Sequence, residues 1–144
     1  MKREYYIFVC LITLCVFIFT SCDPVSTISY RIKNSSKDTI FISANQNYFE
    51  YRIIKKGNYN DISHDNPIAV YPKDIFEAYI WNYGTRIDES NKDSQPFWDY
   101  IQSIRKSSHE LSPDIWENEE NWKNRTNKGL FVENVTYELT INDQ

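Results

Sequence analysis

The chain of 144 residues is 41% hydrophobic, 16% aromatic and 25% charged. These proportions indicate one folded domain and exclude both a disordered tail and a multidomain enzyme. Its 20 acidic and 16 basic side chains leave a formal charge of −4, which disfavours a polyanionic partner, so we predict that the protein binds no nucleic acid.

The N-terminal segment has the layout of an export signal. Lys2 and Arg3 precede an apolar run over 5–19. The small residues Thr20 and Ser21 follow that run. Basic side chains stay on the cytoplasmic side during export, whereas the apolar run partitions into the bilayer. A cleaved signal peptide is therefore predicted. The alternatives are an uncleaved membrane helix, for which the run is short, and a soluble secreted product.

The end of this segment, Phe19-Thr20-Ser21-Cys22, resembles the lipobox of bacterial lipoproteins, and boxes ending in Ser-Cys are common in Bacteroidetes-type lipoproteins. The resemblance implies that the signal peptide over 1–21 is removed and that Cys22 carries the fatty acyl groups, palmitate among them, as the new first residue. It also implies a lipid-anchored location in the cell envelope. The outer membrane is favoured over the inner membrane, and the leaflet stays open.

The cysteines and the spacing of the first strand fit such an anchor. Cys10 and Cys15 would leave with the signal, so the mature chain keeps a single cysteine and forms no intrachain disulfide. A lipidated cysteine and short tether over 22–27 would then reach at most about 15–18 Å before a single globular domain over 28–144. The domain is therefore expected to lie close to the lipid headgroups.

Alternation of apolar and polar residues predicts a series of strands. In the first, Ile28, Tyr30 and Ile32 share one face. Turn formers over 34–38 follow, and they predict a hairpin between the first two strands. Strands are predicted over 28–33, 40–44, 49–55, 68–71 and 135–141, with a polar loop over 58–67.

Two segments mix helical and strand signals. Residues 74–83 fit either a helix face or a strand, and the abundance of aromatic and branched side chains favours the strand. Phe97, Tyr100, Ile101 and Ile104 recur at helical spacing just after a proline, which predicts a helix there.

A second helix is predicted with Ser112 as its N-cap, and it would carry Trp116 and Trp122. Alternating strands indicate an antiparallel sheet with one wet face, and helices grouped late in the chain indicate the α+β class. The predicted fold is a small antiparallel β-sheet or sandwich with one or two helices in the C-terminal half.

The sequence lacks the patterns that usually carry catalysis or metal binding. Nucleophile motifs such as Gly-x-Ser-x-Gly are absent, and His64 and His109 lie far apart in polar contexts. The loop containing Asp61, His64 and Asp65 lacks the glycine and the glutamate of a calcium loop. No catalytic residue, metal or cofactor is predicted. An acidic patch lies around the second helix, at Glu110, Asp114, Glu117, Glu119 and Glu120, and is interpreted as a solvated face.

A few side chains are candidates for ligand or modification sites. Trp98 lies off the apolar stripe and Trp122 lies among charges, so both are candidates for stacking on a sugar or a partner protein. Asp38-Thr39-Ile40 resembles the O-glycosylation site of exported Bacteroidetes-type proteins, which makes Thr39 a candidate acceptor. Arg31 and Lys33 lie near the tether, where they would face either anionic lipid or solvent.

The preferred hypothesis is a membrane-anchored, noncatalytic lipoprotein that binds a glycan or an envelope protein or serves a structural role. The Asn-Ser-Ser-Lys-Asp-Thr-Ile stretch also resembles a segment of small Bacteroidetes-type lipoproteins, which carries no activity with it. Two alternatives remain open at this point. One is a carbohydrate-binding accessory module that uses exposed Trp98 or Trp122, and the other is a small carboxylate-dependent hydrolase.

Overall fold

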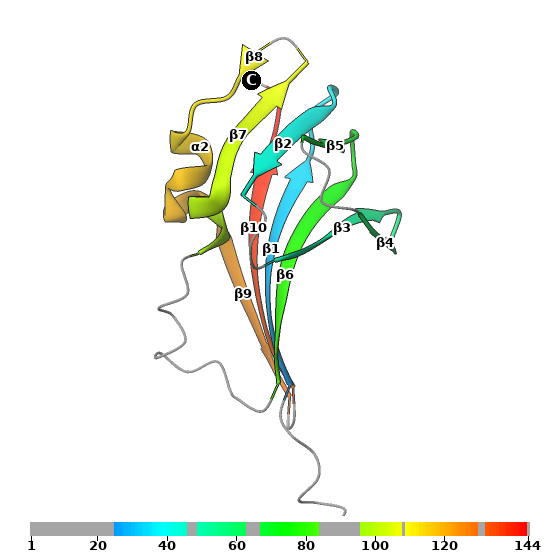
Figure 1. Cartoon of the computed structure of the whole chain (residues 1–144), viewed down its shortest axis with the longest axis vertical. Coiled ribbons are helices and arrows are strands. Elements are labelled where there is room, and N and C mark those ends of the chain that lie inside the picture. Colours follow the sequence, from blue (N-terminus) through cyan, green and yellow to red (C-terminus); the bar gives the residue numbers. More distant parts are fainter. Residues whose placement is uncertain are drawn as a thin grey trace, which may run out of the picture.

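Two β-sheets pack face to face around one core (Figure 1). The structure is a computed structural model that describes residues 25–45, 49–62, 67–83, 96–107, 109–129 and 132–143. The predicted signal peptide, Cys22 and His64 lie outside these residues. Within the described part of the chain, no helix combines the length and apolar character needed to cross a bilayer. The two sheets confirm the prediction of a small β-rich fold.

The larger sheet has six strands in the order β4-β3-β6-β1-β10-β9. Its strands are β1 (Val25–Asn34), β3 (Glu50–Lys55), β4 (Asn58–Asp61), β6 (Ile75–Tyr83), β9 (Lys123–Lys128) and β10 (Val132–Ile141). Neighbours are antiparallel except for β1 and β10, which run parallel over the full length of both strands. The strand favoured over 74–83 is confirmed as β6, whereas the expectation of a purely antiparallel arrangement is wrong for this central pair.

The smaller sheet is antiparallel, with the strand order β5-β2-β7-β8. Its strands are β2 (Ile40–Ala44), β5 (Ile68–Val70), β7 (Ile101–Lys106) and β8 (His109–Glu110). The described residues also form short helical turns: η2 (Phe97–Tyr100), α2 (Asp114–Glu117) and η3 (Glu119–Asn121). In Figure 1 the smaller sheet covers only the upper part of the larger one, beside α2.

The predicted hairpin between the first two strands is wrong, because β1 and β2 belong to different sheets. Both edges of β1 are occupied, by β6 and β10, so β2 has no free edge to pair with. The chain crosses between the sheets in a turn that Asn34 organises. Its buried amide donates to the carbonyls of Asp38 and Val70, each at 2.8 Å, and its Oδ1 accepts from the Ser36 N–H and hydroxyl at 3.0 and 2.7 Å.

The helix predicted over 97–104 is also wrong, since a 3₁₀ turn leads there directly into β7. The register of β7 against β2 shifts, so that Ser43 faces Ser103 while Ala44 faces Ile101 and Gln102 is left without a partner. In a regular strand, residues three apart point to opposite faces. The bulge places both Ile101 and Ile104 in the core, and it thereby imitates the spacing of a helix face.

The second predicted helix exists only as one turn. Pro113 occupies the N-cap position in place of Ser112, whose hydroxyl contacts the Asp114 carboxylate at 3.2 Å. Trp122 lies beyond η3 and not on this helix.

The polar segments 58–61 and 123–128 form the edge strands β4 and β9, which hydrophobic alternation did not reveal. β1 begins at Val25, three residues before the predicted start of the first strand.

Aromatic side chains fill much of the space between the sheets. The Tyr30 ring lies at the centre of this packing, with its centroid 5.1 Å from Tyr137, 5.8 Å from Phe49 and 5.6 Å from Trp98. Branched side chains from both sheets complete the core, among them Ile32, Ile40, Ile42, Val70 and Ile104. Large rings compensate for the small size of a domain that buries little surface per residue.

Candidate functional site

The two candidate stacking tryptophans are part of the core. Trp98 is 8% exposed and Trp122 is 4% exposed, with ring centroids 5.5 Å apart. The Trp122 indole N–H donates to the Trp116 carbonyl at 2.8 Å. The expectation that these side chains are exposed is therefore wrong. Trp98 fits the core because η2 does not continue as a helix, so the stripe that seemed to exclude this residue does not exist.

The other predicted residues occupy surface positions or lie outside the described residues. Thr39 is partly exposed in the turn before β2. The acidic residues around α2 are all exposed: Glu110, Asp114, Glu117, Glu119 and Glu120. His109 is exposed in β8. Within the described ranges, no group of three or more histidine, cysteine, aspartate or glutamate side chains is arranged to hold a metal ion.

A buried carboxylate lies instead on the outer face of the larger sheet, where sequence patterns gave no warning. Glu77 of β6 has no exposed surface, and its two oxygens accept from the Nε atoms of Arg31 and Arg52, the first at 2.8 Å. The ladder aligns Arg31, Glu77 and Arg52 on neighbouring strands. Both oxygens are thus held by cations. Arg31 forms an ion pair with Glu77, and this pairing weakens the expectation that Arg31 faces anionic lipid.

Aromatic rings complete this group of charges. The Arg52 guanidinium lies 4.3 Å from the centroids of both the Tyr59 and the Tyr79 rings. Burial, followed by a hydrogen bond to Glu50, raises the pKa of Tyr79. A cation between two rings and against a carboxylate is held in place from several sides. This arrangement is a structural clamp across β3, β6 and β1, in which both arginines already pair with the Glu77 carboxylate.

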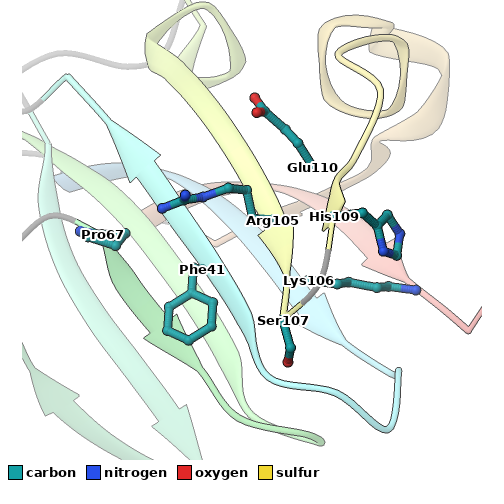
Figure 2. Close-up of a pocket in the computed structure, with 7 residues that line it drawn as sticks. All are labelled: Phe41, Pro67, Arg105, Lys106, Ser107, His109 and Glu110. Atoms are coloured by element: carbon teal, nitrogen blue, oxygen red, sulfur yellow. The ribbon is translucent and has the colours of Figure 1, made fainter.

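A pocket lies on the outer face of the smaller sheet and is the candidate binding site (Figure 2). Its volume is about 460 Å³. The residues that line it come from β2, β7, β8 and the adjoining loops: Phe41, Pro67, Arg105, Lys106, Ser107, His109 and Glu110. A volume of this size falls within the range of ligand pockets, about 300–1,000 Å³.

The register of the strands explains how the pocket is assembled. Phe41 of β2 faces Arg105 of β7, and Arg105 in turn faces Glu110 of β8. These side chains form a row across three strands, because directly paired residues point to the same face. Ile40 and Ile42, which flank Phe41, are fully buried on the opposite face. Phe41 is therefore a large apolar residue on the outward side of its strand, which is the one sequence signal for this site.

The cations of the pocket differ in how strongly they are already engaged. The Lys106 ammonium is nearly buried and donates to the Asn142 carbonyl at 2.8 Å. The exposed Arg105 guanidinium makes no ion pair with any carboxylate of the described residues. Figure 2 shows Arg105 extending over β2 toward Pro67, while Glu110 points another way. Arg105 is thus the cation that the pocket presents to a ligand.

Comparisons with known proteins add no relatives to this picture. No protein-family model, no curated protein and no solved structure matches the chain. The binding chemistry of the site therefore follows from its own side chains. They combine an aromatic ring, a cation without an acidic partner among the described residues, and a carboxylate on one shallow surface.

Proposed function

We propose that the chain is a lipid-anchored, noncatalytic lipoprotein of the bacterial cell envelope, which binds a glycan or an envelope protein or serves a structural role. The observation that carries the proposal is the box Phe19-Thr20-Ser21-Cys22 at the end of an apolar run. Acyl groups on the Cys22 sulfur would hold the domain at the membrane, because two fatty chains bind a bilayer stably. The outer membrane is the favoured location.

The start of β1 supports a domain held close to the bilayer. Only residues 23 and 24 separate Cys22 from the first strand residue, Val25. Three residue steps span at most about 10 Å of extended chain. The end of the larger sheet that contains Val25 would therefore lie at the headgroups.

The position of the pocket supports a binding role for such a domain. The ten residues of β1 rise by about 30 Å along the sheet. The pocket residues of β7 and β8 lie near the end that β1 reaches, opposite the start of β1 (Figure 1). Anchoring at Cys22 would thus present the pocket away from the membrane, toward glycans and neighbouring proteins.

The anchor is tested by metabolic labelling of the full chain with an alkyne analogue of palmitate in a Bacteroidetes-type host, followed by mass spectrometry of the mature N-terminus. The expected product begins at an acylated Cys22. Cys22→Ala should abolish labelling, whereas the matched variant Cys15→Ala should retain it. An unlabelled wild-type chain, or labelling that survives Cys22→Ala, would overturn the proposal.

A further inference from the structure

We infer that the pocket on the smaller sheet binds a carboxylated sugar, a uronic acid within a short glycan, through Arg105, Phe41 and Glu110. The inference rests on the proposed binding role and names its ligand class. Each of the three side chains matches a different part of such a ligand. They lie in one row across β2, β7 and β8, and Arg105 and Glu110 point in different directions (Figure 2), so a ligand that contacts all three must be longer than one sugar ring.

Arg105 sets the requirement for a carboxylate. Its guanidinium has no ion-pair partner among the described residues, and it lies on the surface of a chain whose formal charge is −4. A planar guanidinium binds a carboxylate through two parallel hydrogen bonds, which a neutral hydroxyl cannot reproduce. The ligand is therefore expected to carry an anionic group, and a carboxylate is the one that a sugar acid supplies.

Phe41 and Glu110 set the requirement for a sugar. The face of an aromatic ring is negative and attracts the weakly positive C–H groups of a pyranose. The partly exposed Phe41 ring lies on the outward side of β2, directly beside Arg105. The exposed Glu110 carboxylate accepts hydrogen bonds, and sugar hydroxyls donate them. A fatty acid or a simple carboxylate could pair with Arg105 but offers no hydroxyl to Glu110, which would stay hydrated.

The test is calorimetric titration of the full-length chain in detergent with three probes: digalacturonic acid, its neutral counterpart digalactose, and propionate. Digalacturonic acid should bind with saturation, whereas the neutral sugar and propionate should bind at least tenfold more weakly. Arg105→Gln should weaken digalacturonic acid binding about tenfold to a hundredfold, the usual effect of a lost charge-assisted hydrogen bond. Phe41→Ala should weaken it by a smaller factor.

Arg125→Gln is the matched control, since Arg125 is an exposed arginine of the edge strand β9, in the other sheet. It should leave the affinity unchanged, and equal melting temperatures should show that all three variants fold. Absence of binding, equal binding of the neutral sugar or of propionate, or an unchanged affinity in Arg105→Gln would overturn the inference. A chain that is acylated at Cys22 but gives these results would refute the ligand class and leave the anchor standing.

Discussion

Replacing Asn34 should destabilise the protein more than any exposed substitution, because this side chain joins the two sheets. Asn34 has no exposed surface, and its amide takes part in four hydrogen bonds. Asn34→Ala would remove all four and leave the carbonyls of Asp38 and Val70 and the N–H of Ser36 without this partner. The Ser36 hydroxyl retains a contact with the Asp38 carbonyl at 3.0 Å, so one group is partly compensated.

The cost follows from the number of groups left unsatisfied. Each buried polar group without a partner costs about 1–3 kcal/mol. Because the Asp38 carbonyl keeps the Ser36 hydroxyl, the Val70 carbonyl and the Ser36 N–H are the groups left unsatisfied, which predicts a loss of about 2–6 kcal/mol for Asn34→Ala. This loss is a large fraction of the free energy of unfolding of a typical domain, which is about 5–15 kcal/mol. Urea unfolding followed by tryptophan fluorescence measures it, with the exposed Asn127→Ala as the control that should change stability by less than about 0.5 kcal/mol.

Asn34→Asp separates the loss of donors from the loss of volume. The new carboxylate would keep the acceptor facing Ser36 but would place a second oxygen against two carbonyls, so burial should raise the pKa of this carboxyl. A raised pKa in the folded state makes the variant relatively more stable at low pH, and this gain is lost as the pH rises. A stability of Asn34→Ala within about 1 kcal/mol of the wild type would refute the reasoning.

Three further predictions follow from other parts of the molecule. Glu77→Gln should cost about 1–3 kcal/mol in urea unfolding, since solvent partly screens its two arginine partners, which are 29% and 19% exposed; no loss would contradict the clamp. Burial raises the pKa of Tyr51 to about 12 from 10.0, so the stability that its neutral form contributes should be present below pH 10 and lost between about pH 10 and 12. Tyr51→Phe should reduce that alkaline loss, and an unchanged profile would contradict it. Thr39→Ala should lose the mass of an O-glycan in the producing bacterium while Thr39→Ser retains it, and equal masses for wild type and Thr39→Ala would reject this site.

Sequence patterns predicted the strands whose two faces differ clearly. In β10, Val135, Leu139 and Ile141 are buried and alternate with polar residues, and this alternation predicts the strand correctly. The polar strands β4 and β9 were missed, because edge strands with both faces wet carry no hydrophobic alternation. The bulge in β7 was missed for another reason. It gives Ile101 and Ile104 the spacing of a helix, and only the register against β2 distinguishes the two.

The candidate site was less accessible to sequence analysis than the fold. Phe41 is far from Arg105 and Glu110 in the chain, and only the pairing of β2 with β7 and of β7 with β8 brings the three into one row. The expectation that Trp98 and Trp122 are exposed is wrong for two different reasons. Trp98 was placed off the stripe of a helix that does not form, and the charged neighbours of Trp122 in the chain do not keep its ring out of the core. The clamp of Arg31, Glu77 and Arg52 likewise depends on strand register, which alternation within single strands cannot supply.

The parallel pairing of β1 with β10 has a consequence for the order of events during synthesis. Val25 pairs with Val132 and Asn34 with Ile141, so the central ladder joins residues more than a hundred positions apart. Contacts between such distant residues form slowly and late, because closing the long intervening loop costs entropy. On the proposed export route, the middle of the larger sheet stays incomplete until β10 has emerged from the translocation channel. On that route the chain would stay incompletely folded during translocation and would complete its fold only after export across the membrane.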